Sequence, residues 1–162
     1  MLLPQHYFRR IECIPIDWLM GLGVRAVLLD VDNTLTTHDN PEIYPAAKRW
    51  LQKAAEAGLR LVVVSNNHAP RVAPFARREG LDFECDAHKP LPGGLRRACR
   101  RLGVCPREAA VVGDQLFTDM LGGNLVGAVT ILVQPIEPEN GWFFRLKRAL
   151  ERPLLRGRTP RG

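Results

Sequence analysis

Residues 26–41 read AVLLDVDNTLTTHDNP, an apolar run that ends in two aspartates separated by a single valine. The run predicts a buried strand over residues 26–31. The carboxylates of Asp30 and Asp32 repel each other, and burying either one costs free energy unless it is paired. The stretch therefore indicates a strand end at which a cation or another partner offsets the charge of the two aspartates.

Strand and helix patterns alternate along the rest of the chain. A short helical turn is predicted within residues 14–24, and we expect Asp17 to cap it. Further strands are predicted within residues 60–67, 81–87, 108–114 and 128–135. Helices are predicted within residues 45–58, 69–80, 91–103, 118–127 and 140–152, the last ended by Pro153. The alternation predicts an α/β fold, with one central parallel sheet covered by helices on both faces.

The composition is that of a soluble globular protein, and we place a single domain at residues 1–150. No apolar run approaches the roughly 20 residues that span a bilayer, and the first residues lack the basic-then-apolar order of a signal peptide. We therefore expect a cytoplasmic protein. No cysteine belongs to a CxxC pair or has a histidine at zinc-ligand spacing. We interpret all of them as reduced thiols: Cys13, Cys85, Cys99 and Cys105.

Polar residues follow the predicted strands at the points where the strands end. They are Asp30 with Asp32, Ser65 with Asn66 and Asn67, His88 with Lys89, and Asp114. In a parallel sheet the carboxyl ends of the strands meet at one edge, and ligands bind beyond that edge. The convergence of four separate segments therefore predicts one functional site there.

These residue types suit the transfer of a phosphoryl group. The carboxylates of Asp30, Asp32 and Asp114 would form an oxygen-rich cluster for Mg²⁺, which binds one or two carboxylates together with water and phosphate oxygens. Lys89 adds positive charge, and the Ser65 hydroxyl can hold phosphoryl oxygens. Phosphoryl transfer needs mainly positioning and neutralisation of charge. We therefore predict a phosphate-ester substrate, Asp30 as the covalent nucleophile, and Asp32 as the acid and then the base.

Four motifs resemble, in order, the motifs of the haloacid dehalogenase (HAD) superfamily. They are DVDNT at residues 30–34, VVVSNN at 62–67, HKP at 88–90 and VVGDQLFTD at 111–119. The resemblance implies a three-layer, Rossmannoid HAD-like domain. It also implies a phosphatase that depends on Mg²⁺.

A closer resemblance is to the YqeG-type phosphatases of subclass IIIA, whose relatives include phosphatidylglycerophosphatases. It is carried by IPIDWL at residues 14–19, DNTLTTHDNP at 32–41 and GDQLFTDMLGGNLVGAVTILVQPI at 113–136, with SNN and KP between them. It implies that Asp30 is the nucleophile and a Mg²⁺ ligand. Asp32 would be the acid and base and would bind the metal through its backbone carbonyl. Asp114 would complete the metal shell, and Asp119 would support that shell or orient Lys89.

The other residues of the expected site fall into two groups. The substrate-binding residues would be Thr34, Ser65, Asn66 and Lys89. The second group would position loops rather than catalyse, and its members are His38, Asp39, Asn40, His68 and His88.

The spacing of the motifs excludes a cap domain over the site. Residues 34–60 hold one loop and one helix, and residues 65–89 hold one helix and a short strand. We therefore expect an open site. An open site suits a bulky phosphate held at a surface, such as a lipid headgroup, because a small metabolite would lack an enclosing wall.

The basic character of the chain belongs to its C-terminal segment. Residues 145–162 hold seven basic residues and one acid, so they carry the entire net charge of +6. A predicted amphipathic helix at residues 141–152 precedes a basic tail, residues 153–162, which we expect to be disordered. The apolar face of this helix would be Trp142, Phe143, Leu146, Ala149 and Leu150. The helix could pack on the domain, or residues 142–161 could bind an anionic membrane surface; nucleic-acid binding is the least favoured interpretation.

The sequence thus predicts a phosphatase that forms an aspartyl-phosphate and converts phosphatidylglycerophosphate to phosphatidylglycerol in phospholipid biosynthesis. Such a protein would be cytoplasmic and peripheral on the inner membrane face, and an oligomer is compatible with the sequence. Two alternatives stay open. One is a nucleotide or nucleic-acid-end phosphatase, and the other is a non-catalytic, phosphate-responsive binding module.

Overall fold

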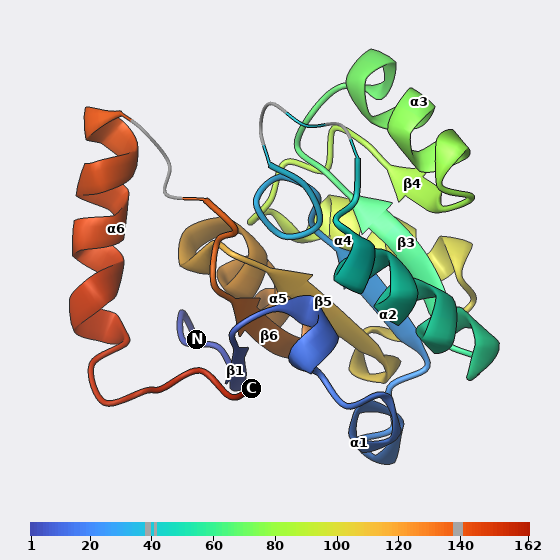
Figure 1. Ribbon diagram of the computed structural model, residues 1–162, viewed down its shortest axis with the longest axis horizontal. Coiled ribbons are helices and arrows are strands. Elements are labelled where there is room, and N and C mark those ends of the chain that lie inside the picture. Colours follow the sequence, from blue (N-terminus) through green and yellow to red (C-terminus); the bar gives the residue numbers. More distant parts are fainter. Residues whose placement is uncertain (38–39, 41, 138–140) are drawn as a thin grey trace.

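The central sheet is parallel throughout. The computed structural model describes residues 1–37, 40, 42–137 and 141–162, the side chains of residues 143 and 144 excepted. Within this part of the chain, six strands lie in the order β1-β6-β5-β2-β3-β4 (Figure 1). The strands are β1 His6–Phe8, β2 Ala26–Leu29, β3 Arg60–Val64, β4 Asp82–Glu84, β5 Ala109–Gly113 and β6 Val129–Val133. The main helices are α1 Ile16–Gly21, α2 Pro45–Glu56, α3 Ala69–Arg78, α4 Pro92–Arg101, α5 Leu121–Val126 and α6 Trp142–Leu154. The predicted α/β fold class is confirmed.

The central strand β2 is buried on both faces because helices cover both. Val27 and Leu29 belong to the hydrophobic cluster that includes residues of α2 and α3. Ala26 and Leu28 point the other way, into the cluster that includes residues of α4. Successive side chains of a strand alternate between the two faces of the sheet, so a strand between two helical layers has to be apolar at every position.

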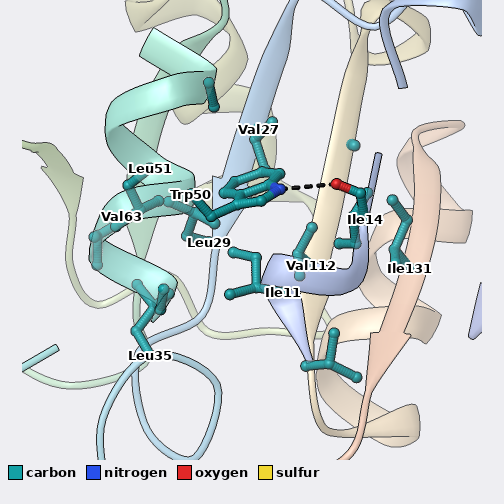
Figure 2. Packing of buried hydrophobic residues seen from close by; sticks show 14 of the residues in the cluster. Ile11, Ile14, Val27, Leu29, Leu35, Trp50, Leu51, Val63, Val112 and Ile131 are labelled. Carbon is teal, nitrogen blue, oxygen red and sulfur yellow. Dashed lines mark hydrogen bonds between the residues drawn. The ribbon is translucent and has the colours of Figure 1, made fainter. Parts of the chain in front are cut away.

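Trp50 joins α2 to the segment before α1. Its indole ring lies among Val27, Leu29 and Ile11, and its Nε1–H donates a hydrogen bond of 2.8 Å to the carbonyl oxygen of Ile14 (Figure 2). A buried indole N–H without a partner would cost free energy, so this bond allows the full ring to contribute to the core.

The sequence analysis did not predict β1 or the contact that the tail makes with it. β1 pairs with β6, with Phe8 opposite Val133, but three residues are too few to produce a strand pattern. The segment after α6, predicted to be disordered, returns to β1: the Arg161 N–H donates to the Tyr7 carbonyl and the Arg161 carbonyl accepts from Arg9, both at 2.9 Å. An edge strand offers unpaired backbone groups, and residue 161 satisfies two of them.

Two predicted helix boundaries also differ. Pro15 occupies the N-cap of α1, and Asp17 lies inside the first turn, where its negative charge favours the helix N-terminus without capping it. Helix α6 continues past Pro153 to Leu154. Pro153 has no N–H to donate to the carbonyl four residues earlier, so one helical hydrogen bond is lost, but this loss falls close to the C-terminal end of the helix.

The predicted absence of a cap domain is confirmed for the described residues. Between β2 and α2 they form a loop, with one isolated bridge between Asp32 and Thr36. Between β3 and α4 they form α3 and β4. Neither connection contains an inserted domain.

Gly94 offers a test of how tightly α4 packs near the site. A Cβ atom at Gly94 would lie 2.6 Å from the Cα and the carbonyl oxygen of Ala87, which precedes Lys89 by two residues. We expect Gly94→Ala to destabilise the protein by about 1–3 kcal/mol because backbone would have to move. Urea unfolding followed by circular dichroism measures this change.

The neighbouring glycine is the matched control. A Cβ atom at Gly93 would meet the flexible Arg97 guanidinium at 3.5 Å, so Gly93→Ala should be neutral or stabilise α4 by up to about 1 kcal/mol. Equal unfolding midpoints for the two variants would show that α4 does not pack closely on residue 87.

Candidate active site

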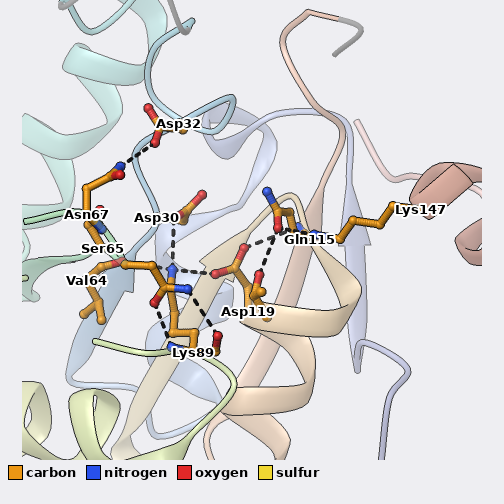
Figure 3. A network of polar contacts seen from close by, with 11 residues as sticks. Asp30, Asp32, Val64, Ser65, Asn67, Lys89, Gln115, Asp119 and Lys147 are labelled. Carbon is orange, nitrogen blue, oxygen red and sulfur yellow. Dashed lines mark hydrogen bonds and ion pairs between the residues drawn. The ribbon is translucent and has the colours of Figure 1, made fainter. Parts of the chain in front are cut away.

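Asp30, Ser65 and Lys89 lie close together at the carboxyl edge of the sheet (Figure 3). Asp30 directly follows β2, Ser65 follows β3, Asp114 follows β5, and Lys89 comes from the loop after β4. β2 lies between β3 and β5, and its register pairs Leu29 with Val112. This parallel register brings the ends of the strands to one place.

Lys89 is a fixed, buried cation within this site. Its Nζ donates to Asp30 Oδ1 at 2.9 Å, to Asp119 Oδ1 at 2.6 Å and to the carbonyl oxygen of Val64 at 2.9 Å (Figure 3). Burial alone would lower the pKa of Lys89, but the charges of Asp119 and Asp30 and their hydrogen bonds outweigh burial and raise it. The ammonium group is therefore charged and directed at both carboxylates.

Asn66 holds the backbone of Lys89. Its Oδ1 accepts from the Lys89 N–H at 2.7 Å, and its Nδ2 donates to the Lys89 carbonyl at 3.1 Å. Asn66 was expected to bind substrate; the structure shows that it contacts the backbone of Lys89, and a contact with substrate stays a prediction. This two-point bond sets the position of Lys89.

Three carboxylates form the acidic part of the site. Asp30, Asp114 and Asp119 each offer an oxygen, and these oxygens lie within 4.8 Å of one another. Burial, followed by the charge of Asp119, raises the pKa of Asp30 to about 7 despite the opposing charge of Lys89. Burial and the charges of Asp30 and Asp119 raise the pKa of Asp114 well above its ordinary value. Burial is the main cause of both raised pKa values, and the mutual repulsion of the carboxylates adds to it; a bound cation would relieve that repulsion.

This donor set fits a Mg²⁺ ion. Mg²⁺ prefers carboxylate oxygens and keeps positions open for water and phosphate oxygens. The side chain of Asp114 is fully buried, yet its Oδ1 accepts no hydrogen bond from any described residue. A buried carboxylate oxygen without a donor is costly, and coordination to a cation would satisfy it.

Asp32 lies apart from these three carboxylates. Its Oδ2 accepts from Asn67 Nδ2 at 3.0 Å (Figure 3), and its Oδ1 lies 3.5 Å from the Arg71 guanidinium. The side chain of Asp32 is 26% exposed, against 15% for Asp30. The two aspartates of the DxD pair therefore face different surroundings, which reduces their mutual repulsion.

Asp32 faces a pocket of about 320 Å³. The pocket lies on the β2–β3 side of the site, and Asp30, Lys89 and Asp114 are not among its lining residues. The lining combines polar and apolar groups: Val31, Asp32, Thr36, Thr37, Asn40, Ser65, Asn67, Arg71, Val72 and Phe75. Such a mixture suits a ligand with both an anionic and an apolar part.

The turn after Asp32 depends on Asn33 and hides Thr34. Asn33 has a φ of 60°, in the left-handed region that asparagine tolerates, and its N–H donates to the Thr36 carbonyl at 2.7 Å. Thr34 is 1% exposed, and its buried hydroxyl has no hydrogen-bond partner in the described structure. Thr34 was expected to bind substrate; the structure places it in the interior, and a contact between its hydroxyl and substrate stays a prediction.

Three of the residues that were expected to position loops make contacts with other loop residues. Asn40 Oδ1 accepts from the Glu42 N–H at 3.0 Å, so Asn40 orders its own loop. His68 pairs with Asp86, and His88 Nδ1 contacts the Asp86 carbonyl. His38 and Asp39 lie outside the described residues.

Sequence reasoning missed the partners that α6 supplies. Arg148 pairs with Asp114 at 2.6 Å, and Lys147 donates to Gln115 (Figure 3). The site is therefore bounded by α6 on one side and is less open than expected. The sequence held one indication that α6 packs on the domain: Glu151 is the single acidic residue in 145–162, a segment with seven basic residues. The structure shows that Glu151 is buried. Asn67 and Arg71 were also missed as partners of Asp32.

Comparisons with known proteins agree with this geometry. Residues 37–127 match the family of haloacid dehalogenase-like hydrolases. The chain is 36% identical over 153 residues to the probable phosphatase YqeG of Bacillus subtilis (strain 168), covering 94% of this chain and 89% of that protein. It is 30% identical over 153 residues to the chloroplastic/mitochondrial phosphatidylglycerophosphate phosphatase 1 of Arabidopsis thaliana, covering 87% of this chain and 44% of that longer protein.

A solved structure supports the fold independently of sequence. NagD from E. coli K-12 superposes with a TM-score of 0.58 at 16% identity, covering 68% of this chain and 87% of NagD. The matched segment of the family, residues 37–127, covers more than half of the chain, and the YqeG alignment extends over nearly all of it. With the motif residues gathered at one sheet edge, these matches show that the chain belongs to the haloacid dehalogenase-like hydrolase family and is one of its phosphatases.

Proposed function

We propose that this phosphatase hydrolyses phosphate monoesters with Mg²⁺ and through an aspartyl-phosphate on Asp30. The main support is the position of Asp30: its carboxylate is fixed by Lys89 and lies beside Asp114 and Asp119. A nucleophile held in one orientation next to a cation can attack phosphorus with little reorganisation.

The residues of the site would share the reaction as follows. Asp30, Asp114 and the backbone carbonyl of Asp32 would hold Mg²⁺, which when bound supplies charge neutralisation for the phosphoryl oxygens. An oxygen of Asp30 attacks phosphorus, and the bond from phosphorus to the ester oxygen breaks. The Ser65 hydroxyl accepts a hydrogen bond from the Asn67 N–H at 3.0 Å, so its own proton is available to a phosphoryl oxygen.

Asp32 is placed to handle the proton on the leaving-group side. Asp32 lines the pocket, in which the leaving group would lie, and Asp30 is not among the lining residues. Asp32 would donate a proton to the departing alcohol oxygen. As a carboxylate it would then take a proton from the water that attacks the aspartyl-phosphate, which releases inorganic phosphate and restores Asp30.

We propose phosphatidylglycerophosphate as the physiological substrate, with the protein peripheral on the inner membrane face. Arg71 lines the pocket together with the apolar residues Val72 and Phe75, and a cationic lining residue suits an ester with a second anionic group. The named activity of the Arabidopsis relative points to the same compound.

Helix α6 has the character of a membrane-surface element. Leu146 and Leu150 are 52% and 57% exposed, and basic residues flank them. No helix in the described ranges is long and apolar enough to cross a bilayer. An exposed apolar stripe beside arginines would instead lie at the surface of an anionic membrane.

The nucleophile is tested by Asp30→Asn. The amide cannot form the aspartyl-phosphate, so we expect the release of phosphate to fall on the order of 10⁴-fold or more. Circular dichroism should show an intact fold, and Asp82→Asn, at an exposed position on β4, should keep full activity. Retained turnover in Asp30→Asn would rule out the covalent mechanism.

The substrate is tested by a panel assayed with Mg²⁺ and with a chelator. The panel contains phosphatidylglycerophosphate, sugar phosphates, nucleotides and a 5′-phosphorylated oligonucleotide. We expect the highest kcat/KM for the phospholipid and no turnover under chelation. Faster turnover of the nucleotide or the oligonucleotide end would favour the alternative function, for which the basic tail is the supporting observation.

The membrane role is tested by the pair Leu146→Ser and Leu150→Ser. If these side chains enter the interface, their removal should weaken binding to anionic vesicles by roughly 10- to 100-fold, as measured by cosedimentation. Hydrolysis of a soluble aryl phosphate should stay unchanged because both side chains are exposed and neither lines the pocket. Unaltered vesicle binding would exclude α6 as the membrane contact.

A further inference from the structure

Helix α6 binds three successive residues of the loop that follows β5. Lys147 donates to the Gln115 side chain, and Arg148 donates to Asp114. The Leu116 N–H donates to Glu151 Oε1 at 3.3 Å. Residues 114–116 begin the segment that supplies Asp114 and Asp119 to the acidic site, so α6 is attached to the site's own framework.

The guanidinium of Arg148 holds Asp114 at two points. Its NH2 group donates to Asp114 Oδ2 at 2.6 Å, and its NH1 group donates to the Asp114 carbonyl oxygen at 2.8 Å. A planar guanidinium with donors in a fixed arrangement restrains both the side chain and the main chain of its partner. Asp114 Oδ2 is therefore occupied, whereas the buried Oδ1 has no hydrogen-bond partner in the described structure.

Glu151 holds Arg148 in turn. Its Oε2 accepts from Arg148 NH1 at 2.9 Å, and the residue is 2% exposed. A buried carboxylate is costly unless it is paired, and here Oε1 accepts from the Leu116 N–H and Oε2 accepts from Arg148. The negative charge of Glu151 also offsets the positive charge of Arg148, which limits the repulsion that Arg148 would exert on a nearby cation.

We propose that Arg148 is a positioning residue for the metal site. It restrains Asp114 through Oδ2 and the carbonyl oxygen, and so leaves Oδ1 as the oxygen available to the ion, while Glu151 keeps Arg148 in place. Partners of this kind orient the residues that ligate a metal and commonly change its affinity by roughly 10- to 100-fold. This inference rests on the Mg²⁺ site of the proposed function and adds α6 to that site.

The opposite role would be a cation that competes with the metal for Asp114. The two roles predict opposite changes in Mg²⁺ affinity when the Arg148 side chain is removed. A competing Arg148 would weaken metal binding, so its removal would raise the affinity. A positioning Arg148 strengthens metal binding, so its removal lowers the affinity.

The experiment measures Mg²⁺ binding to the full chain by isothermal titration calorimetry. We expect Arg148→Ala to lower the affinity roughly 10- to 100-fold. Arg148→Lys should recover only part of this loss, because a lysine keeps the charge but not the two-point geometry. The matched control is Arg145→Ala, which removes an exposed arginine one turn earlier in α6 and should bind Mg²⁺ as the wild type does.

Enzyme kinetics give a second readout that a loss of fold would not mimic. Saturating Mg²⁺ should restore most of the kcat of Arg148→Ala, because the defect lies in metal affinity. Glu151→Gln, which weakens the hold on Arg148, should shift the Mg²⁺ requirement in the same direction by a smaller factor. If Arg148→Ala unfolds the chain, the Mg²⁺ affinities of Arg148→Lys and Glu151→Gln are compared with that of the wild type instead.

Unchanged or tighter Mg²⁺ binding by the folded Arg148 variants would overturn the positioning role, and tighter binding would identify a competing cation. A wild-type chain that binds no Mg²⁺ would overturn the proposed metal site together with this inference. Wild-type binding with unaltered variants would overturn the role of Arg148 alone, so the two failures are distinguishable.

Discussion

The buried ammonium group of Lys89 is the interaction on which the site depends. It contacts Asp30 after β2, the carbonyl of Val64 at the end of β3, and Asp119 in the segment after β5. Burying carboxylates is unfavourable unless a charge compensates them, and breaking such a buried pair costs more than forming it gains. Lys89 therefore makes it possible for the strand ends to carry acidic residues in the interior, and Asn66 fixes its backbone for that purpose.

One ammonium group does not neutralise the acidic residues that surround it. Asp114 receives its own cation, Arg148, and that cation is shared with Glu151. The remaining negative charge is concentrated where Asp30, Asp114 and Asp119 approach one another, which is the physical basis of the proposed metal position. Asp32 lies outside this group and faces the pocket, so the site separates a carboxylate-rich half from a half that would receive the leaving group.

Helix α6 contacts the acidic site with some of its side chains and exposes others to solvent. Its polar residues, Arg148 and Glu151, bind the loop after β5, and its leucines are exposed on other sides of the helix. In Figure 1, α6 lies at one side of the sheet, and the chain then returns to β1. The helix therefore both packs on the domain and presents an apolar stripe, so the two interpretations of its amphipathic pattern are compatible.

The sequence alone determined the parallel sheet and the identity of the polar residues at its edge. Continuous apolar runs specify doubly buried strands, and the carboxyl ends of parallel strands necessarily converge, which accounts for Asp30, Ser65, Lys89 and Asp114. Only the tertiary structure decided that Asn66 bonds the backbone of Lys89, that Thr34 is buried, that residue 161 pairs with β1, and that Arg148 reaches Asp114. These features depend on single hydrogen bonds and ion pairs between distant residues, which leave no periodic pattern in the sequence.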